Sequence, residues 1–232
     1  ASTSGETIVY RHGKDLFHWN SKTKERPQPI TMQPASDVYL GEDQFTRLLS
    51  RADDVAFSSD GLEIAFVAGG DVWVMDTVLR EPRQVTNTVE YEVAVKWGPD
   101  DDSLWYTQHQ STRSDIFRAE REDSSLPWWR NSRFRSTPVT DDGHTEQQLL
   151  FTPDGKHLLY VRSPGELWVR ALESGKSRLL ARGFDNPQFD ISADSRWVAF
   201  SQTDDNFNRD VFLASIDGSV EPVNVSQHPD DD

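Results

Sequence analysis

Few residues in this chain have the types and spacing that hydrolytic chemistry requires. A covalent hydrolase holds a nucleophile against a general base, and a third group orients that base. The 232 residues include no cysteine and no Gly-x-Ser-x-Gly turn. The single Ser-x-x-Lys match, "SKTK" at 21–24, lies in a polar stretch that is typical of a turn between strands. We therefore predict no catalytic residue and no enzymatic activity of the chain itself.

Metal binding is predicted to be absent as well. The stretch "DDNFNRD" at 204–210 places Asp204, Asn206 and Asn208 at alternate positions, as in a calcium-binding loop. An EF-hand would then need Gly at the sixth place and Glu at the twelfth, where this chain has Arg209 and Ser215. We expect these polar side chains to cap a turn between two strands. No zinc-ligand spacing joins the six histidines, which are His12, His18, His109, His144, His157 and His228. We predict no metal and no cofactor.

The strongest candidate for recognition is the stretch "PWWRNSRFR" at 127–135. It gathers aromatic and basic side chains in a chain whose net charge is −15. Insertions on rigid scaffolds often carry recognition, and exposed Trp and Arg are typical anchors. The candidate binding residues are Trp128, Trp129, Arg130, Arg133, Phe134 and Arg135. The competing interpretation is that the aromatic rings fold back onto outer strands and cover a sheet edge.

A repeat provides the scaffold that must position these residues. One recurring pattern is an apolar residue followed three positions later by Asp. It occurs as "FSSDG", "WGPDD", "FTPDG" and "ISADS", whose fourth residues are Asp60, Asp100, Asp154 and Asp194. An acidic, an aliphatic and an aromatic residue then follow, beginning at Asp71, Asp115, Glu166 and Asp210, with an extra copy at Asp15. Because every copy carries these acids, we predict structural roles for them in turns and at strand starts. The steps from one turn Asp to the next are 40, 54 and 40 residues, and the long second step contains the insertion at 121–136.

Each repeat is predicted to form four short strands, at about 53–58, 62–68, 71–76 and 83–87 in the second copy. Four-stranded units of about 40 residues are typical of β-propeller blades. We predict an all-β β-propeller of four complete blades plus a partial fifth, forming an arc of a larger propeller assembly, with a closed five-bladed ring as the alternative. The predicted parts are a partial blade at 1–34 that starts at its second strand, a linker at 35–52, and blades within 53–232 at about 53–91, 92–145, 146–184 and 185–228.

The repeat residues resemble a known class of propellers. "FTPDGKHLLYV" and "FSSDGLEIAFVAGGDVWVMD" are similar to the repeats of TolB-like and tricorn-type propellers. Residues 52–75 and 202–229 resemble propeller segments of tricorn-type serine proteases, and 29–58 resembles the passage from one propeller to the next. In that family, propellers that filter substrates and guide peptides precede a PDZ module and a serine protease domain. The resemblance implies a non-catalytic section to which no family catalytic residue can be transferred.

Two functions follow as expectations. The first is a non-catalytic propeller section of a tricorn-type protease, and the alternative is a self-contained TolB-like propeller that binds a protein partner. Expected partners are a peptide or protein, other domains of the same polypeptide, and a second copy of the chain. The acidic charge argues against nucleic acid, and no apolar run approaches the length of a membrane helix. The compartment stays open between cytoplasmic and exported.

Overall fold

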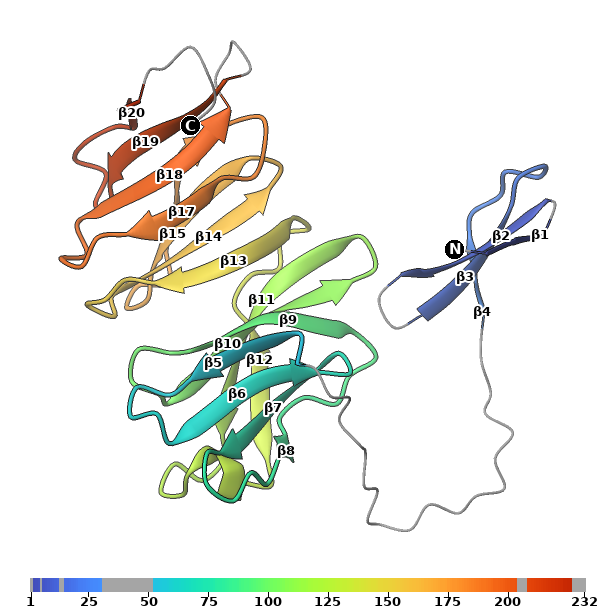
Figure 1. Cartoon of the computed structure of the whole chain (residues 1–232), viewed down its shortest axis with the longest axis horizontal. Helices are drawn as coiled ribbons and strands as arrows, with labels where there is room; N and C mark the ends of the chain where they lie inside the picture. Colours follow the sequence, from blue (N-terminus) through green and yellow to red (C-terminus); the bar gives the residue numbers. More distant parts are fainter. Residues whose placement is uncertain (1, 5, 13–14, 31–51, 204–207, 227–232) are drawn as a thin grey trace.

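The computed structural model describes residues 2–4, 6–12, 15–30, 52–203 and 208–226. Its strands form five successive units of four antiparallel strands, which we number 1 to 5 along the chain (Figure 1). Units 3 and 4 share one eight-stranded sheet through a parallel bridge between Ser114 and Thr145. Units 2 to 5 follow one another in Figure 1 from the cyan ribbon to the red one. In the described part of the chain, no helix is long and apolar enough to cross a membrane.

The elements have the following bounds. Unit 1 contains β1 (Ser2–Ser4), β2 (Thr7–His12), β3 (Asp15–Asn20) and β4 (Gln28–Ile30). Unit 2 contains β5 (Asp54–Phe57), β6 (Glu63–Ala68), β7 (Asp71–Asp76) and β8 (Arg83–Gln84). Unit 3 contains β9 (Tyr91–Trp97), β10 (Ser103–Gln110), β11 (Arg113–Arg121), the 3-10 helix η1 (Trp128–Arg130) and β12 (Phe134–Pro138). Unit 4 contains β13 (Thr145–Phe151), β14 (His157–Ser163), β15 (Glu166–Ala171) and β16 (Ser177–Arg182). Unit 5 contains β17 (Gln188–Ile191), β18 (Trp197–Thr203), β19 (Arg209–Ser215) and β20 (Val223–Asn224).

Unit 1 corrects one expectation from the sequence. We expected it to begin at its second strand, but Ser2, Thr3 and Ser4 form a short strand that pairs with residues 7–9 of β2. A polar triplet has no apolar alternation, so the pattern of side chains could not indicate this strand. The predicted linker at 35–52 lies almost wholly outside the described residues.

The turn between the first and second strands is built by the recurring acid. In unit 2 the Ser58 hydroxyl donates to Asp60 at 2.7 Å, and the Leu62 N–H donates to the same carboxylate at 2.9 Å. These bonds, the backbone N–H first, lower the pKa of Asp60. Units 4 and 5 repeat the arrangement at Asp154 and Asp194. The prediction that these three acids cap turns is confirmed.

Unit 3 builds the same turn differently. Gly98 stands where the other units have Ser or Thr, and a Cβ atom there would lie 2.4 Å from the Ser103 Oγ. The hydroxyl therefore comes from the opposite strand, and it accepts a hydrogen bond from Trp105 Nε1 at 3.0 Å.

The acidic residue at the start of the third strand of a unit contacts a side chain of the fourth strand. The pairs that make this bond are Gln84 with Asp71 at 3.1 Å, Arg182 with Glu166 at 2.6 Å and Asn224 with Asp210 at 2.5 Å. These contacts support the structural role that the sequence predicted for the acids in units 2, 4 and 5.

Neighbouring units pack face on face. We call the side of a unit that contacts the preceding unit its front face, and the opposite side its back face. The first core joins the back face of unit 2 to the front face of unit 3, through Ala65, Val67, Val72, Val74, Val95, Trp97, Leu104 and Tyr106. Similar cores join unit 3 to unit 4 and unit 4 to unit 5. In the first core, the larger front-face residues Trp97, Leu104 and Tyr106 of unit 3 cover small aliphatic residues of unit 2.

Candidate functional site

The insertion of unit 3 connects β11 to β12 and is held by one buried side chain. The Asn131 amide donates to the carbonyls of Asp123, Leu126 and Pro127 at 3.1, 3.3 and 3.0 Å. Its carbonyl oxygen accepts the Asp123 N–H at 3.0 Å. Because Asn131 is only 3% exposed, these bonds are shielded from water. The insertion is therefore an ordered loop with a defined surface.

Two of the six candidate residues lie in the core. Trp128 is fully buried, and its ring stacks on Phe134 with ring centres 5.6 Å apart. It also meets Trp97 edge to face, and its Nε1 donates to the Asp101 carbonyl at 2.8 Å. Burial of this kind is a packing role for Trp128, whereas Phe134 packs against the core while only partly buried.

Two more candidates lie on the exposed side of β12 and its approach. Arg135 donates to Glu120 at 2.5 Å, and Arg133 lies 3.8 Å from Glu122. The hydrogen bond from Arg135 lowers the pKa of Glu120; burial acts in the opposite direction, and the charge of Arg118 adds to the lowering. These arginines neutralise the acids of β11 beside them.

The remaining candidates, Trp129 and Arg130, project toward unit 2. The Trp129 N–H donates to Glu63 at 3.1 Å, and its carbonyl accepts from Arg83 at 3.3 Å. The Arg130 guanidinium lies 4.7 Å from the centre of the Trp129 ring, a cation–π contact. The insertion thus bridges to the preceding unit through the backbone of Trp129, and Arg130 packs on the Trp129 ring.

A groove of about 470 Å³ runs between this part of the insertion and the turns of unit 2. We call it the insertion groove. Its lining consists of Asp60, Leu62, Glu63, Asp76, Thr77, Val78, Arg121, Ser124, Ser125, Leu126, Pro127 and Trp129. Leu62 is 60% exposed and Val78 is 80% exposed, with Leu126 at 39% and the adjacent Leu79 at 61%. Contiguous exposed apolar side chains around a groove mark a docking surface.

Hydrogen bonds hold the apolar tip of the β7–β8 turn in place. Asp76 accepts the backbone N–H groups of Val78 and Leu79. Burial acts to raise the pKa of Asp76, but these N–H bonds outweigh it and lower the pKa. The turn that exposes Val78 and Leu79 to solvent is therefore fixed by hydrogen bonds to Asp76.

The charges around the groove are of both signs. Burial raises the pKa of Glu63, and the Trp129 N–H offsets part of that rise. Arg83 and Arg130 flank Trp129, and neither forms an ion pair within the described residues. Arg83 and Arg130 do not line the groove itself, which contains the acids Asp60, Glu63 and Asp76. Their guanidinium groups lie beside Trp129 at its edge and can bind a carboxylate.

The sequence pattern pointed to the insertion but missed the residues that unit 2 contributes. One signal was present in the repeat itself. Leu62 occupies the turn position at which the other units have Asp102, Lys156 and Arg196. An apolar residue at a position that is otherwise charged indicates a contact that the other copies lack.

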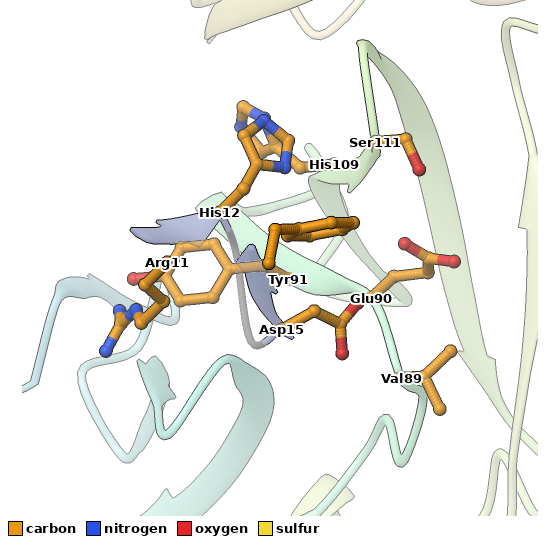
Figure 2. Close-up of a pocket in the computed structure, with 9 residues that line it drawn as sticks. Arg11, His12, Asp15, Val89, Glu90, Tyr91, His109 and Ser111 are labelled. Atoms are coloured by element: carbon orange, nitrogen blue, oxygen red, sulfur yellow. The ribbon is translucent and has the colours of Figure 1, made fainter. Parts of the chain in front are cut away.

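A second cavity, of about 460 Å³, lies between strands β2 and β3 of unit 1 and the residues around β9 and β10 of unit 3 (Figure 2). Its lining includes Arg11, His12, Asp15, Glu90, Tyr91 and His109. Burial, followed by the charge of His12, lowers the pKa of His109. Tyr91 donates to Asp53 at 3.3 Å and meets His109 edge to face.

No hydrolytic pair is assembled in the described part of the chain. Ser111 and His109 both line the second cavity, but no serine hydroxyl donates to a histidine ring among the described residues. The Ser21 hydroxyl of the Ser-x-x-Lys match donates to the Glu6 carbonyl at 3.0 Å. No group of three His, Cys, Asp or Glu residues could hold a metal ion within the same residues. Of the residues considered for calcium, Asp204 and Asn206 lie outside the described part.

Known proteins of similar sequence and structure agree on the fold. No protein-family model matches the chain. The Tricorn protease homolog of Saccharolobus solfataricus is 21% identical over 223 residues, which are 95% of this chain and 19% of that protein. The crystal structure of the tricorn protease covers 97% of this chain with a TM-score of 0.62 and 17% identity, and 21% of its own chain is matched. TolB from Acinetobacter baumannii covers 97% of this chain with a TM-score of 0.57 and 16% identity, and 52% of its chain is matched.

The fold is that of a tricorn-like and TolB-like β-propeller region. This propeller region spans about a fifth of the length of the tricorn relatives that it matches. Within the described residues, no sheet joins strands of unit 1 to strands of unit 5. The insertion groove therefore lies on a propeller region, where binding sites are built from the loops between strands.

Proposed function

We propose that this propeller region is a non-catalytic section of a tricorn-type protease that binds and guides peptides. The observation that carries the proposal is the likeness to the Tricorn protease homolog, which extends over 95% of this chain. Units 2 to 5 are consecutive blades in an arc of a larger propeller assembly, and unit 1 belongs to a preceding propeller or blade.

The insertion groove is the proposed peptide contact. Leu62, Val78 and Leu126 line the groove and can contact a hydrophobic side chain. Arg83 and Arg130, which contact Trp129 outside that lining, can bind a carboxylate at its edge. A peptide that pairs an aliphatic or aromatic residue with a nearby acid would satisfy both parts of the groove. The net charge of −15 would repel acidic peptides elsewhere on the surface, so the two arginines localise them.

The replacement of Leu62 by Lys tests this contact. Unit 4 has Lys156 at the same turn position, so the turn itself tolerates the change. Binding of fluorescein-labelled peptides with Phe or Leu beside Glu is measured by fluorescence anisotropy. We expect Leu62→Lys to weaken binding at least tenfold without a change in melting temperature. Val220→Lys, on an apolar side chain of unit 5 that is 38% exposed, is the matched control and should bind normally. No binding by the wild type, or equal loss in both variants, would overturn the proposal.

The non-catalytic role has its own test. The purified chain is incubated with unstructured peptides and with a fluorophosphonate probe that labels activated serines. We expect no turnover and no labelling. Stoichiometric labelling of one serine, with turnover lost when that serine is changed to Ala, would contradict the role.

A self-contained TolB-like interaction propeller is the second candidate. It is supported by the likeness to two TolB structures, of which the one from Agrobacterium tumefaciens is matched over 76% of its own chain with a TM-score of 0.57 and 16% identity. The reading frame of the gene after codon 232 separates the two candidates. A PDZ and serine protease region supports the first, and a stop codon at that point supports the second.

A further inference from the structure

Two arginines from facing sheets line one cleft between units 3 and 4. The cleft has a volume of about 560 Å³, and we call it the arginine cleft. Arg118 of β11 pairs directly with Trp105, and Arg170 of β15 pairs directly with Leu158. Trp105 and Leu158 belong to the core between the two units, and directly paired residues share one face of a sheet. The back face of unit 3 and the front face of unit 4 therefore each contribute one arginine to the same cleft.

Elsewhere in units 2 to 5, apolar side chains occupy both positions. Arg118 is the fourth residue counted from the acid that begins the third strand, and Arg170 is the fifth. The residues equivalent to Arg118 are Val74, Val169 and Leu213. The residues equivalent to Arg170 are Met75, Ala119 and Ala214. The repeat therefore does not require arginine at either position, and among units 2 to 5 only the junction of units 3 and 4 brings two together.

Arg118 is held in place with part of its guanidinium unused. Its Nη2 lies 3.0 Å from Glu120, which also accepts a hydrogen bond from Arg135 at 2.5 Å. The guanidinium carbon lies 5.9 Å from the centre of the Trp105 ring, a cation–π contact that orients the group. The Arg118 Nε is buried and has no hydrogen-bond partner among the described residues. Because a buried donor without a partner is unfavourable, an acceptor in the cleft would stabilise this arrangement.

Arg170 is positioned by neutral groups. Its Nη1 donates to the Ser177 hydroxyl at 3.2 Å. Its Nη2 lies beside Gly175, where an added Cβ atom would be 3.3 Å away. Within the described residues, Arg170 forms no ion pair. Its half-buried guanidinium can therefore bind an anionic group of a ligand.

Three acids also line the cleft, and all of them lie on turns. Asp100 and Asp102 follow β9, and Glu173 follows β15. The three acids are exposed whereas both arginines are half-buried, so water and salt screen the acids more than the arginines. Asp102 is also paired with Arg121 at 2.7 Å. The cleft therefore fits an anion beside the arginines and a cation beside Asp100 and Glu173.

A carboxylate suits the two arginines. A guanidinium group binds a carboxylate through two parallel N–H bonds. Two guanidinium groups in one cleft repel each other, and a carboxylate between them offsets that repulsion. Trp105, Pro138 and Leu172 add an apolar wall against which the methylene groups of a glutamate can pack. The cleft therefore matches an acidic side chain that has a basic neighbour.

The arginine cleft adjoins the insertion groove. Both are lined by turns between first and second strands and by residues that follow third strands, so they open on the same side of the propeller region. Asp102 of the cleft and Arg121 of the groove form an ion pair between the two. Unit 3 separates them, and neighbouring sheets pack about 10 Å apart. An extended peptide covers that distance with about three residues, since each adds roughly 3.3 Å.

We propose that the arginine cleft binds an acidic peptide residue about three positions away from the apolar residue that contacts the insertion groove. This inference rests on the proposed function, because it places the same peptide across both hollows. The carboxylate accepts N–H groups of Arg118 and Arg170, and a basic neighbour of the acid contacts Asp100 or Glu173. The propeller region thereby selects peptides by the spacing of an apolar and an acidic residue.

Fluorescence anisotropy with a matched pair of labelled peptides tests the cleft. The wild type should bind Phe-Ala-Ala-Glu-Lys on the order of tenfold more tightly than Phe-Ala-Ala-Gln-Lys, because only the first offers a carboxylate. Arg118→Val and Arg170→Ala introduce residues that other units have at these positions, so folding should be retained, and melting temperature checks it. Each variant should lose most of the preference for Glu. Arg196→Ala removes one exposed arginine of unit 5 and should keep the preference.

A third peptide, Phe-Glu-Ala-Ala-Lys, separates the cleft from the groove. It should bind Arg118→Val and Arg170→Ala as it binds the wild type, whereas Leu62→Lys should weaken it. Equal binding of the Glu and Gln peptides by the wild type, or an unchanged preference in both arginine variants, would overturn the inference and leave the groove proposal standing. A preference that Arg196→Ala also loses would reveal a general charge effect and overturn it too. Failure of the wild type to bind any of the three peptides would overturn the proposed function itself, and the inference with it.

Discussion

Replacement of Trp128 by alanine separates packing from recognition within the insertion. The side chain is fully buried between Phe134 and Trp97, with ring centres 5.6 Å from each. Its indole N–H donates to the Asp101 carbonyl at 2.8 Å. The substitution removes both ring contacts and leaves a cavity in the core that joins units 2 and 3.

The expected cost follows from these contacts. Truncation of a buried Trp to Ala lowers the free energy of unfolding by about 3–5 kcal/mol, because the loss of buried apolar surface and the cavity left behind both destabilise the folded state. For a chain of this length, each kcal/mol lowers the melting temperature by about 2–4 °C. We expect a fall on the order of 10 °C for Trp128→Ala. Trp128→Phe keeps a ring but loses the hydrogen bond, so it should cost about 1–2 kcal/mol.

The assay compares Trp128→Ala with Trp129→Ala by thermal unfolding, followed by circular dichroism, and by peptide anisotropy. Trp129 lines the insertion groove, so its replacement should leave the melting temperature within about 2 °C and weaken peptide binding. If Trp128→Ala unfolded at the wild-type temperature while abolishing binding, the division of the insertion into core and surface would be refuted.

Three further predictions concern the scaffold. Burial raises the pKa of Glu146 to about 7, above the 4.5 of a free carboxyl, so the folded state retains a proton that the unfolded state releases. The free energy of unfolding should therefore fall as the pH rises from about 4.5 to 7. Measured by urea unfolding, Glu146→Gln should be more stable than the wild type at pH 8 but not at pH 4. An equal gain at both pH values would contradict this prediction. Asn131→Ala should cost about 1–3 kcal/mol in the same assay, because it leaves buried carbonyls unpaired, and an unchanged midpoint would contradict it. Gly165→Ala should lower the free energy of unfolding by roughly 3 kcal/mol, because the added Cβ atom would lie 2.0 Å from the Gly183 carbonyl oxygen. Gly61→Ala is the control, since Gly61 has the same φ of 69° but open space around it, and it should cost only about 1 kcal/mol. Equal losses in the two variants would refute the steric clash.

The repeating part of the fold could be predicted from local pattern. The strand at 71–76 matches β7, because alternation of apolar residues over six positions reports one buried face. The turn at Asp60 could be predicted because its bonds are made within a few residues of the acid. The first strand of unit 1 could not, since its polar residues are defined only by pairing with β2.

The candidate site was predictable only in part. The insertion was visible as an interruption of the repeat, and its aromatic and basic residues indicated an unusual segment. The sequence could not separate Trp128 from Trp129, which are neighbours of one type, because a single 3-10 turn sends one ring into the core and the other toward the groove. The contribution of unit 2 was missed because Leu62 and Trp129 are far apart in the chain.

By itself, the sequence determined that this protein is a series of four-stranded β units without a recognisable catalytic motif. That information is local, since periodic burial, turn acids and strand starts each act over fewer than ten residues. Only the tertiary structure decided which side chains of the insertion are buried and which residues line the groove. The physical reason is that burial and pocket shape arise where segments from different units meet, and the pattern within one segment does not show which other segment it contacts.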